Sequence, residues 1–365
     1  MIHQLVPGLA AGDAIGNYAV ALRGIFRGWG MAGSQIFSVA RDARLADPGR
    51  PVSDLRLKTG DWLVYHFGNA SPVSEAAFAH RSQLILCYHN ITPGHFFAPY
   101  SAPAAARLDQ GRRELKGFAG ARAVAVSAYN QTELRALGFA DPGRVPLWVD
   151  ADSLRRSAAS PAGQAVRARY PREAAGRRWV NWFFVGRIAP NKRHDALIRA
   201  FSDYQRRIEA SSRLLLVGGW QSFPGYKSEL DFLIRRLGVQ NVVFAGQPSY
   251  EQGFGGYYAA ADLFVSASEH EGFGVPLVEA MAFSLPVIAR NCAGVSEAVG
   301  DGGLLIDRPE PEAVAEGARI MLADAGVRAY YASGQPARVA AHDLAAVAAA
   351  WRETLTAFES ERRAT

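Results

Sequence analysis

Residues 266–279 read S-A-S-E-H-E-G-F-G-V-P-L-V-E, a strand end, a glycine-rich turn and a helix start in immediate succession. The apolar run 263–265 predicts the strand, and Pro276 is suited to the first turn of the helix. Gly272 and Gly274 allow backbone N–H groups to approach a ligand closely, and a helix N-terminus carries partial positive charge. The turn is therefore suited to a phosphate or a diphosphate.

Two glutamates bracket this turn. Glu271 precedes it and Glu279 follows in the first turns of the helix, with seven residues between them. A carboxylate beside a phosphate would repel it, so these side chains are better suited to accept hydrogen bonds from hydroxyl groups. A ligand with phosphates in the middle and hydroxyls at both ends is a nucleotide sugar.

The E-x7-E pattern from Glu271 to Glu279, with G-F-G and P-L-V-E-A-M-A around it, resembles the nucleotide-sugar motif of retaining glycosyltransferases of family 4, the glycosyl transferases group 1. The resemblance implies an α/β protein with the GT-B fold, in which two Rossmann-like domains with parallel sheets face a central cleft. It implies that backbone N–H groups of Phe273, Gly274 and Val275 bind the donor. Glu279 would accept hydrogen bonds from the ribose, and Glu271 would bind the sugar in the catalytic centre.

A second segment, residues 180–201, supports this interpretation. Its apolar run 182–185 predicts a buried parallel strand, after which come Arg187 and Lys192. The C-terminal edge of such a sheet faces the ligand, and two cations there would neutralise a diphosphate and stabilise a departing one. The family resemblance agrees, because G-R-x4-K is its diphosphate-binding pair. Ordinary solvated surface charge is the alternative for both residues.

The first half of the chain begins with a strand followed by a glycine-rich turn, residues 9–18. This turn lacks G-x-G-x-x-G, which argues against a dinucleotide enzyme. In the resemblance, the loop approaches the donor phosphates, with Gly16 at the helix start and Asp13 nearby. The alternative is an ordinary turn in which Asp13 or Asn17 caps the helix.

A histidine, His89, follows the apolar run 83–88. The resemblance implies that it hydrogen-bonds and orients the donor sugar, so we include it among the catalytic residues; a buried structural histidine is the alternative. His66, after another predicted strand, is a weaker candidate on the acceptor side.

Strand and helix patterns alternate in both halves, which predicts two parallel sheets with right-handed crossovers. We expect an N-terminal acceptor domain at 1–165 and a C-terminal donor domain at 177–345, with the last helix, about 346–362, packing back on the first. The expected strands are 2–7, 34–39, 62–66, 83–88, 123–127 and 145–149, then 182–185, 214–217, 242–245, 263–266 and 287–289. The expected helices include 16–29, 129–137 and 345–358.

One feature points to a different class of enzyme. Asp150 and Asp152 form Asp-x-Asp after a predicted strand, as in metal-dependent GT-A glycosyltransferases. That interpretation leaves Arg187, Lys192 and E-x7-E without a use. We therefore predict no metal and no cofactor besides the nucleotide-sugar co-substrate.

Composition narrows the setting. The chain has 365 residues, 49% of them hydrophobic, and only two cysteines, which excludes a disulfide framework and favours the cytoplasm. No apolar run approaches the roughly 18 residues that span a bilayer, and no signal peptide is evident.

Residues 1–175 carry 20 Lys and Arg against 13 Asp and Glu. The predicted basic helix within them contains Arg107, Arg112, Arg113 and Lys116. Such a helix could contact anionic lipid at the inner face of the membrane, and an arginine-rich proteome is the alternative explanation for its charge. Nucleic acid is not expected, because no recognition motif accompanies the charge.

The sequence thus predicts a retaining, metal-independent glycosyltransferase. It would move a hexose from a nucleoside-diphosphate sugar to a hydroxyl of a glycan or lipid-linked acceptor, in cell-surface polysaccharide synthesis. Two alternatives stay open: a nucleotide-sugar epimerase or hydrolase on the same fold, and a nucleotide-sugar-binding subunit without catalysis.

Overall fold

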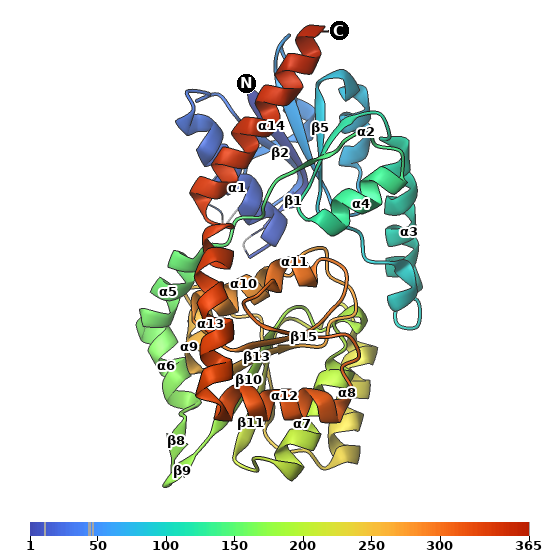
Figure 1. Ribbon diagram of the computed structural model, residues 1–365. Helices are drawn as coiled ribbons and strands as arrows, with labels where there is room; N and C mark the ends of the chain where they lie inside the picture. Colours follow the sequence, from blue (N-terminus) through green and yellow to red (C-terminus); the bar gives the residue numbers. More distant parts are fainter. Residues whose placement is uncertain (11, 43–44, 46, 365) are drawn as a thin grey trace. The chain divides into compact units, whose positions relative to one another are not determined.

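The computed structural model describes residues 1–10, 12–42, 45 and 47–364, and these form two compact units. The first unit comprises the described residues of Met1–His95, Pro103–Trp148 and Leu344–Thr365. The second comprises Phe96–Ala102 and Val149–Asp343. Each unit is built on its own parallel sheet (Figure 1).

The sheet of the first unit has the strand order β3-β2-β1-β4-β5-β6-β7, and all of its pairs are parallel. Every residue of β4 and β5 is buried, as expected for strands with helices on both faces. The strands are β1 (Ile2–Leu9), β2 (Ile36–Arg41), β3 (Arg50–Pro51), β4 (Trp62–Phe67), β5 (Leu84–Tyr88), β6 (Arg122–Ala125) and β7 (Gly143–Arg144). The α-helices are α1 (Ala14–Gly28), α2 (Val73–Ala79), α3 (Ala102–Gly117), α4 (Ala128–Ala136) and α14 (Leu344–Ala364).

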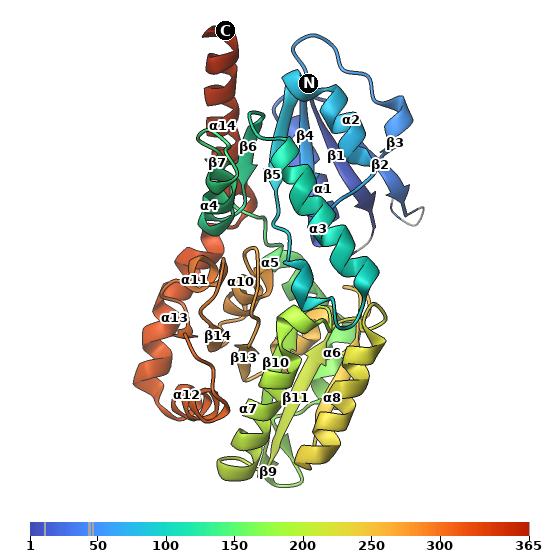
Figure 2. The same cartoon turned by 90° about the vertical axis from the view of Figure 1, so that its right-hand side faces the viewer.

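The last helix, α14, completes the core of this first unit. Its indole Trp351 is fully buried, lies edge-on to Phe26 at 5.9 Å between ring centroids, and donates a hydrogen bond to the Tyr18 hydroxyl at 2.9 Å. Leu355 and Phe358 join the same apolar cluster. Figure 2 shows α14, at the red end of the chain, running alongside β7. The helix therefore covers a sheet whose strands all precede it in the sequence by some 200 residues or more.

The sheet of the second unit has the order β12-β11-β10-β13-β14-β15, again all parallel, and Figure 1 shows its strands enclosed among helices. A short antiparallel hairpin, β8–β9, precedes it. The strands are β8 (Glu173–Ala174), β9 (Arg177–Arg178), β10 (Val180–Val185), β11 (Ser212–Val217), β12 (Val242–Gly246), β13 (Leu263–Ser266), β14 (Val287–Arg290) and β15 (Leu304–Ile306). The α-helices are α5 (Ala151–Ala159), α6 (Pro161–Arg169), α7 (His194–Arg207), α8 (Pro224–Leu237), α9 (Phe254–Ala260), α10 (Val275–Ala282), α11 (Val295–Val299), α12 (Pro311–Ala323) and α13 (Ala325–Ala340). Single 3₁₀ turns occur at Val52–Asp54, Arg81–Gln83, Gly94–Phe96 and Pro190–Lys192.

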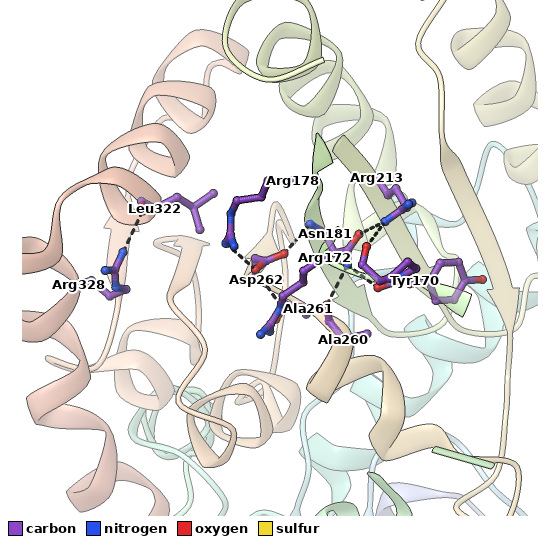
Figure 3. Close-up of polar contacts among 11 residues, drawn as sticks. Tyr170, Arg172, Arg178, Asn181, Arg213, Ala260, Ala261, Asp262, Leu322 and Arg328 are labelled. Carbon is purple, nitrogen blue, oxygen red and sulfur yellow. Dashed lines mark hydrogen bonds and ion pairs between the residues drawn. The ribbon is translucent and has the colours of Figure 1, made fainter. Parts of the chain in front are cut away.

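A polar network at the N-terminal ends of β10 and β13 attaches the segment before the sheet to this second unit (Figure 3). The carboxylate of Asp262 accepts a hydrogen bond from the Asn181 backbone N–H at 2.9 Å and lies 3.0 Å from the Arg172 guanidinium. The Asn181 side-chain amide donates to the carbonyls of Tyr170 and Ala260, at 3.0 and 2.9 Å. Since α5 and α6 also pack on α9, residues 149–178 group with the second sheet, and the division of the chain falls at Val149.

The expected alternation of strands and helices is confirmed, with one error in the first half. No strand forms at 145–149. The Val145 N–H still bonds the Ala125 carbonyl at 3.0 Å, but Pro146 has no N–H with which to extend the pairing beyond β7. Residues 151–177 contain α5, α6 and β8. Among the helices that the structure describes, none has the length and apolar character needed to cross a bilayer.

Candidate functional site

The second sheet has a topological switch point beside its first strand. β10 lies between β11 and β13, so the chain leaves β10 toward one side and later returns on the other. In open α/β sheets ligands bind outside the C-terminal ends of strands at such a point. The two loops that meet there, 186–193 and 267–274, are joined by a bond from the Glu269 N–H to the Asn191 carbonyl at 2.8 Å and from the Asn191 amide to the His270 carbonyl at 3.1 Å. The predicted phosphate-binding residues lie on these loops.

A glycine after β11 supports the first of these loops. Gly218 has φ +154°, and a side-chain carbon there would collide with the carbonyl oxygen of Gly186. The Ile188 N–H also bonds the Gly219 carbonyl at 2.9 Å. The loop that carries Arg187 therefore rests directly on the backbone of the neighbouring loop. Sequence reasoning missed this pair of glycines, although their position straight after the apolar run 214–217 was the signal.

Arg187 follows β10 and is exposed, with its guanidinium 5.9 Å from the centre of the Phe223 ring. No carboxylate of the described residues forms an ion pair with it. The position thus presents an uncompensated positive charge at the switch point.

Lys192 and Glu271 form an ion pair in which the ammonium lies 2.5 and 2.6 Å from the two carboxylate oxygens. Only 20% and 15% of their side-chain surfaces are exposed. The sequence assigned these residues to a diphosphate and to sugar hydroxyls respectively, and the structure brings them together. Each side chain neutralises the charge of the other.

The glycine-rich turn of residues 272–275 leads into α10. Gly274 is the N-terminal cap with φ +104° and supplies no side-chain bond to the helix. The Phe273 ring is buried, 4.6 Å from the ring of His342, so only its backbone is available to a ligand. Gly294 packs against Gly272 so closely that a side-chain carbon would clash with the Gly272 carbonyl. These contacts fix the turn ahead of the first N–H groups of α10.

Glu279, one turn further along α10, is partly buried and accepts a short hydrogen bond from the Tyr258 hydroxyl. Burial raises the pKa of Glu279 to about 7; the bond from Tyr258 opposes this rise and the nearby charge of Asp150 adds to it. Neither partner was identified from the sequence, because both come from distant segments of the chain. Glu279 is therefore a carboxyl group that titrates near neutral pH.

The two carboxylates of the Asp-x-Asp pair are used differently. Asp150 is the N-cap of α5 and accepts from the Ser153 N–H at 2.9 Å, whereas Asp152 is exposed and lies 3.3 Å from Arg155. Among the described residues, the group placed closely enough to hold a metal is instead His66, Cys87 and His89, in the first unit.

The predicted residues of the first unit lie after β1 and β5. Asp13 caps α1 by accepting from the Gly16 N–H at 2.7 Å, and burial raises its pKa. This is the capping role that the sequence left open as the alternative. His89 lies 2.9 Å from His66, between its Nε2 and the Nδ1 of His66, and burial lowers the pKa of His89 to about 3. The sequence singled out each histidine but not their contact.

Comparison with known proteins shows what the second unit is similar to. Residues 181–336 match the sequence profile of glycosyl transferases group 1. The chain is 35% identical over 199 residues to D-inositol 3-phosphate glycosyltransferase 2 of Catenulispora acidiphila, covering 52% of this chain and 45% of that protein. It is 31% identical over 217 residues to D-inositol 3-phosphate glycosyltransferase of Kineococcus radiotolerans, covering 56% and 49%. The chain thus spans less than half the length of these curated relatives.

Solved structures resemble the whole chain. Sucrose-phosphate synthase of Thermosynechococcus elongatus aligns with a TM-score of 0.73 at 19% identity, over all of both chains. HepE of Anabaena, solved with UDP and glucose, aligns with a TM-score of 0.71 at 20% identity, covering 98% of this chain and all of that one. WaaG, described as a glycosyltransferase of lipopolysaccharide biosynthesis, aligns at 0.67 and 14%, covering 96% and 98%. At these identities the likeness shows the fold, which is the GT-B fold expected from the sequence.

Proposed function

We propose that this chain, whose residues 181–336 match the sequence profile of glycosyl transferases group 1, transfers a hexose from a nucleoside-diphosphate sugar to a hydroxyl acceptor with retention of configuration. The observation that carries the proposal is the placement of Arg187 and Lys192 at the switch point of the second sheet. Arg187 has no acidic partner among the described residues, and its loop is hydrogen-bonded to the loop that precedes α10. A cation there and a helix start without a side-chain cap are suited to a dianionic diphosphate.

The hydroxyl-bearing ends of the donor would engage the two glutamates. Glu279 accepts hydrogen bonds from the ribose once its carboxyl group is ionised, and Glu271 accepts from the hexose when the diphosphate takes over Lys192. His89 orients the sugar. Gly16 and Asp13 act in donor binding through the turn that they hold together at the start of α1.

The chemical step would draw on charge that is already in place. As the bond between sugar and diphosphate breaks, negative charge grows on the leaving oxygen, and Arg187, Lys192 and the N–H groups of residues 273–275 stabilise it. The acceptor hydroxyl attacks on the same face of the sugar, and its proton passes to the departing diphosphate. Atoms and charges balance without a further base, and configuration is retained.

A thermal-shift panel tests the donor site. UDP, GDP, ADP, CMP and dTDP would be added alone and as their common sugars; UDP is the first choice because HepE was solved with it. A ligand at a hundredfold excess over its Kd stabilises the fold by about 2.7 kcal/mol. We expect one nucleotide series to raise the melting temperature, and the shift to be smaller in Arg187→Ala. No shift with any nucleotide would contradict the proposal.

The pH dependence of nucleotide binding follows from Glu279. Its pKa of about 7 lies above the ordinary 4.5, so the carboxyl is largely protonated below neutral pH. If only the ionised form accepts from the ribose, affinity falls about tenfold per pH unit below 7 and levels off above it. Titration calorimetry from pH 5.5 to 8.5 measures this. Phosphate groups titrate nearby, so Glu279→Gln is the control: it should bind weakly and show only the phosphate's own, shallower pH dependence.

Removing divalent ions should leave turnover unchanged. The positive charge comes from Arg187 and Lys192, and Asp150 is engaged in capping α5. Assays after EDTA treatment, and again after Mg2+ or Mn2+ is restored, measure the effect. Complete loss of turnover that either ion reverses would favour the metal-dependent alternative.

The acceptor would be a glycan or lipid-linked hydroxyl, with the enzyme in cell-surface polysaccharide synthesis at the inner face of the membrane. The relatives named for D-inositol 3-phosphate make a cyclitol phosphate a useful first addition to an acceptor panel. Basic residues of α3 would contact anionic lipid. Arg112 is held by the Ile91 carbonyl and Glu133, whereas three of its neighbours are exposed, namely Arg107, Arg113 and Lys116.

A further inference from the structure

A chain of hydrogen bonds in the first unit links a glutamine on β1 to His89. The Gln4 side chain is fully buried, and its Nε2 donates to the Ala19 carbonyl at 2.9 Å. Its Oε1 lies 2.8 Å from Nε2 of His66, and Nδ1 of His66 lies 2.9 Å from Nε2 of His89. The three side chains come from β1, the end of β4 and the residue after β5.

The donor and the acceptor of each of these hydrogen bonds follow from the bond between Gln4 and Ala19. A backbone carbonyl can only accept, so the amide nitrogen of Gln4 must face Ala19 and its oxygen must face His66. That oxygen also can only accept, so Nε2 of His66 carries a proton. Burial lowers the pKa of His66 well below its usual value, so the ring is neutral and its Nδ1 is bare.

The same reasoning extends one ring further. A bare Nδ1 on His66 accepts, so Nε2 of His89 must carry the proton that bridges them. His89 is neutral as well, since burial lowers its pKa to about 3. Its Nδ1 is therefore an acceptor, and no described residue donates to that atom. His89 is partly exposed, which leaves this nitrogen for a ligand.

We propose that Gln4 and His66 are positioning residues, which hold His89 in the tautomer with its proton on Nε2 and so present Nδ1 to a donor-sugar hydroxyl. The inference rests on the proposed function for its ligand and on the hydrogen-bond chain for the tautomer. The opposite tautomer would present an N–H, and a sugar hydroxyl would then have to accept. The chain of hydrogen bonds from Gln4 to His89 thus makes the site recognise a hydroxyl that donates rather than one that accepts.

The rings are also fixed in orientation. Tyr18 packs edge-on against both imidazoles, with centroids 5.9 Å from His66 and 5.8 Å from His89. Its hydroxyl donates to the Pro146 carbonyl at 3.0 Å and accepts from Trp351. Because the Tyr18 hydroxyl already donates its proton to Pro146, it has no proton to donate to a nitrogen of His89.

A metal centre is the competing explanation for this cluster, because Cys87 lies 3.5 Å from His89 Nε2. The geometry argues against it. Zinc holds imidazole nitrogens at about 2.0–2.1 Å, which sets two tetrahedral nitrogens well over 3 Å apart, whereas the two histidine nitrogens are 2.9 Å apart. Burial raises the pKa of the Cys87 thiol, so it stays protonated and is a poor ligand.

Long-range 1H–15N NMR of the full chain labelled at histidine reads the tautomer directly. We expect His89 to show a protonated Nε2 and an unprotonated Nδ1 across neutral pH, and His66 to show the same tautomer. A proton on Nδ1 of His89, or a mixture of tautomers, overturns the proposal whatever the enzyme transfers. So does a stoichiometric Zn2+ titration that moves the signals of both histidines.

A Gln4→Leu variant tests the consequence for catalysis. Without the amide acceptor, His66 and His89 should lose their single tautomer in the same spectra, and kcat should fall about tenfold, the loss expected when one hydrogen bond that supports a substrate contact is removed. Binding of the free nucleoside diphosphate, which has no sugar, should be unchanged. His89→Asn keeps a side-chain acceptor and should retain more activity than His89→Leu. Wild-type kinetics in Gln4→Leu with its tautomers mixed would contradict the positioning role, whereas failure of nucleotide binding in the wild type would count against the proposed function alone.

Discussion

Replacing Arg187 by alanine is expected to lower kcat about a hundredfold with little change in stability. The side chain is exposed and has no acidic partner among the described residues, so its removal leaves no buried charge and no cavity. What is lost is one charge-assisted contact that strengthens as the diphosphate departs, worth roughly 3 kcal/mol. Single-turnover kinetics with a saturating donor, beside thermal unfolding, would separate the two effects.

Two further variants sharpen this test. Arg187→Lys keeps the charge but loses the planar fork, so its rate should fall between those of the wild type and Arg187→Ala. Arg319→Ala removes an exposed arginine that pairs with Glu316 on α12, away from the switch point, and should not change turnover. Near wild-type turnover in Arg187→Ala would remove the proposed role of this residue.

Truncating Trp351 to alanine is expected to have the largest effect on stability. The indole is fully buried among residues of the first unit, and deleting a buried tryptophan costs about 3–5 kcal/mol. The Tyr18 hydroxyl would also lose the hydrogen bond that it accepts. Trp351→Phe keeps most of the ring contact with Phe26 and should cost only about 1–2 kcal/mol.

Because the chain has two units, a single melting temperature is not a sufficient measure. Hydrogen exchange followed by mass spectrometry measures the stability of each unit separately. Amides of α1 and β6 should exchange faster in Trp351→Ala, while amides of β10 and β13 should keep their protection. Equal loss of protection in α1 and β6 and in β10 and β13 would show that the tryptophan stabilises more than the first unit.

The sequence predicted those features that lie next to one another along the chain. The apolar runs predict the strands β10 and β13. The residues that follow each run must then lie at the same edge of a parallel sheet. Arg187 and Glu271 could therefore be assigned to one region from the sequence alone. The strand expected at 145–149 was wrong because five apolar or neutral residues fit a strand while Pro146 cannot extend its pairing.

Contacts between distant segments could not be predicted in this way. The pKa of Glu279 depends on Tyr258 and Asp150, which lie 21 and 129 positions away in the sequence. The bond between Gln4 and His66 depends on the register that sets Gln4 opposite Val64 in β1 and β4. Such pairs need the strand order and register, and these arise from packing of the whole unit.

The return of α14 to the first sheet has a consequence for synthesis on the ribosome. The second unit is drawn almost entirely from one stretch, Val149–Asp343, whereas the first needs residues from both ends of the chain. The nascent first unit must therefore wait, with the surface that Trp351 covers still open, while some 200 further residues are translated. At 5–20 residues per second that interval is roughly 10–40 seconds. The first unit is thus the first to be translated and the last to be completed. Until α14 is made, its apolar surface stays accessible to chaperones.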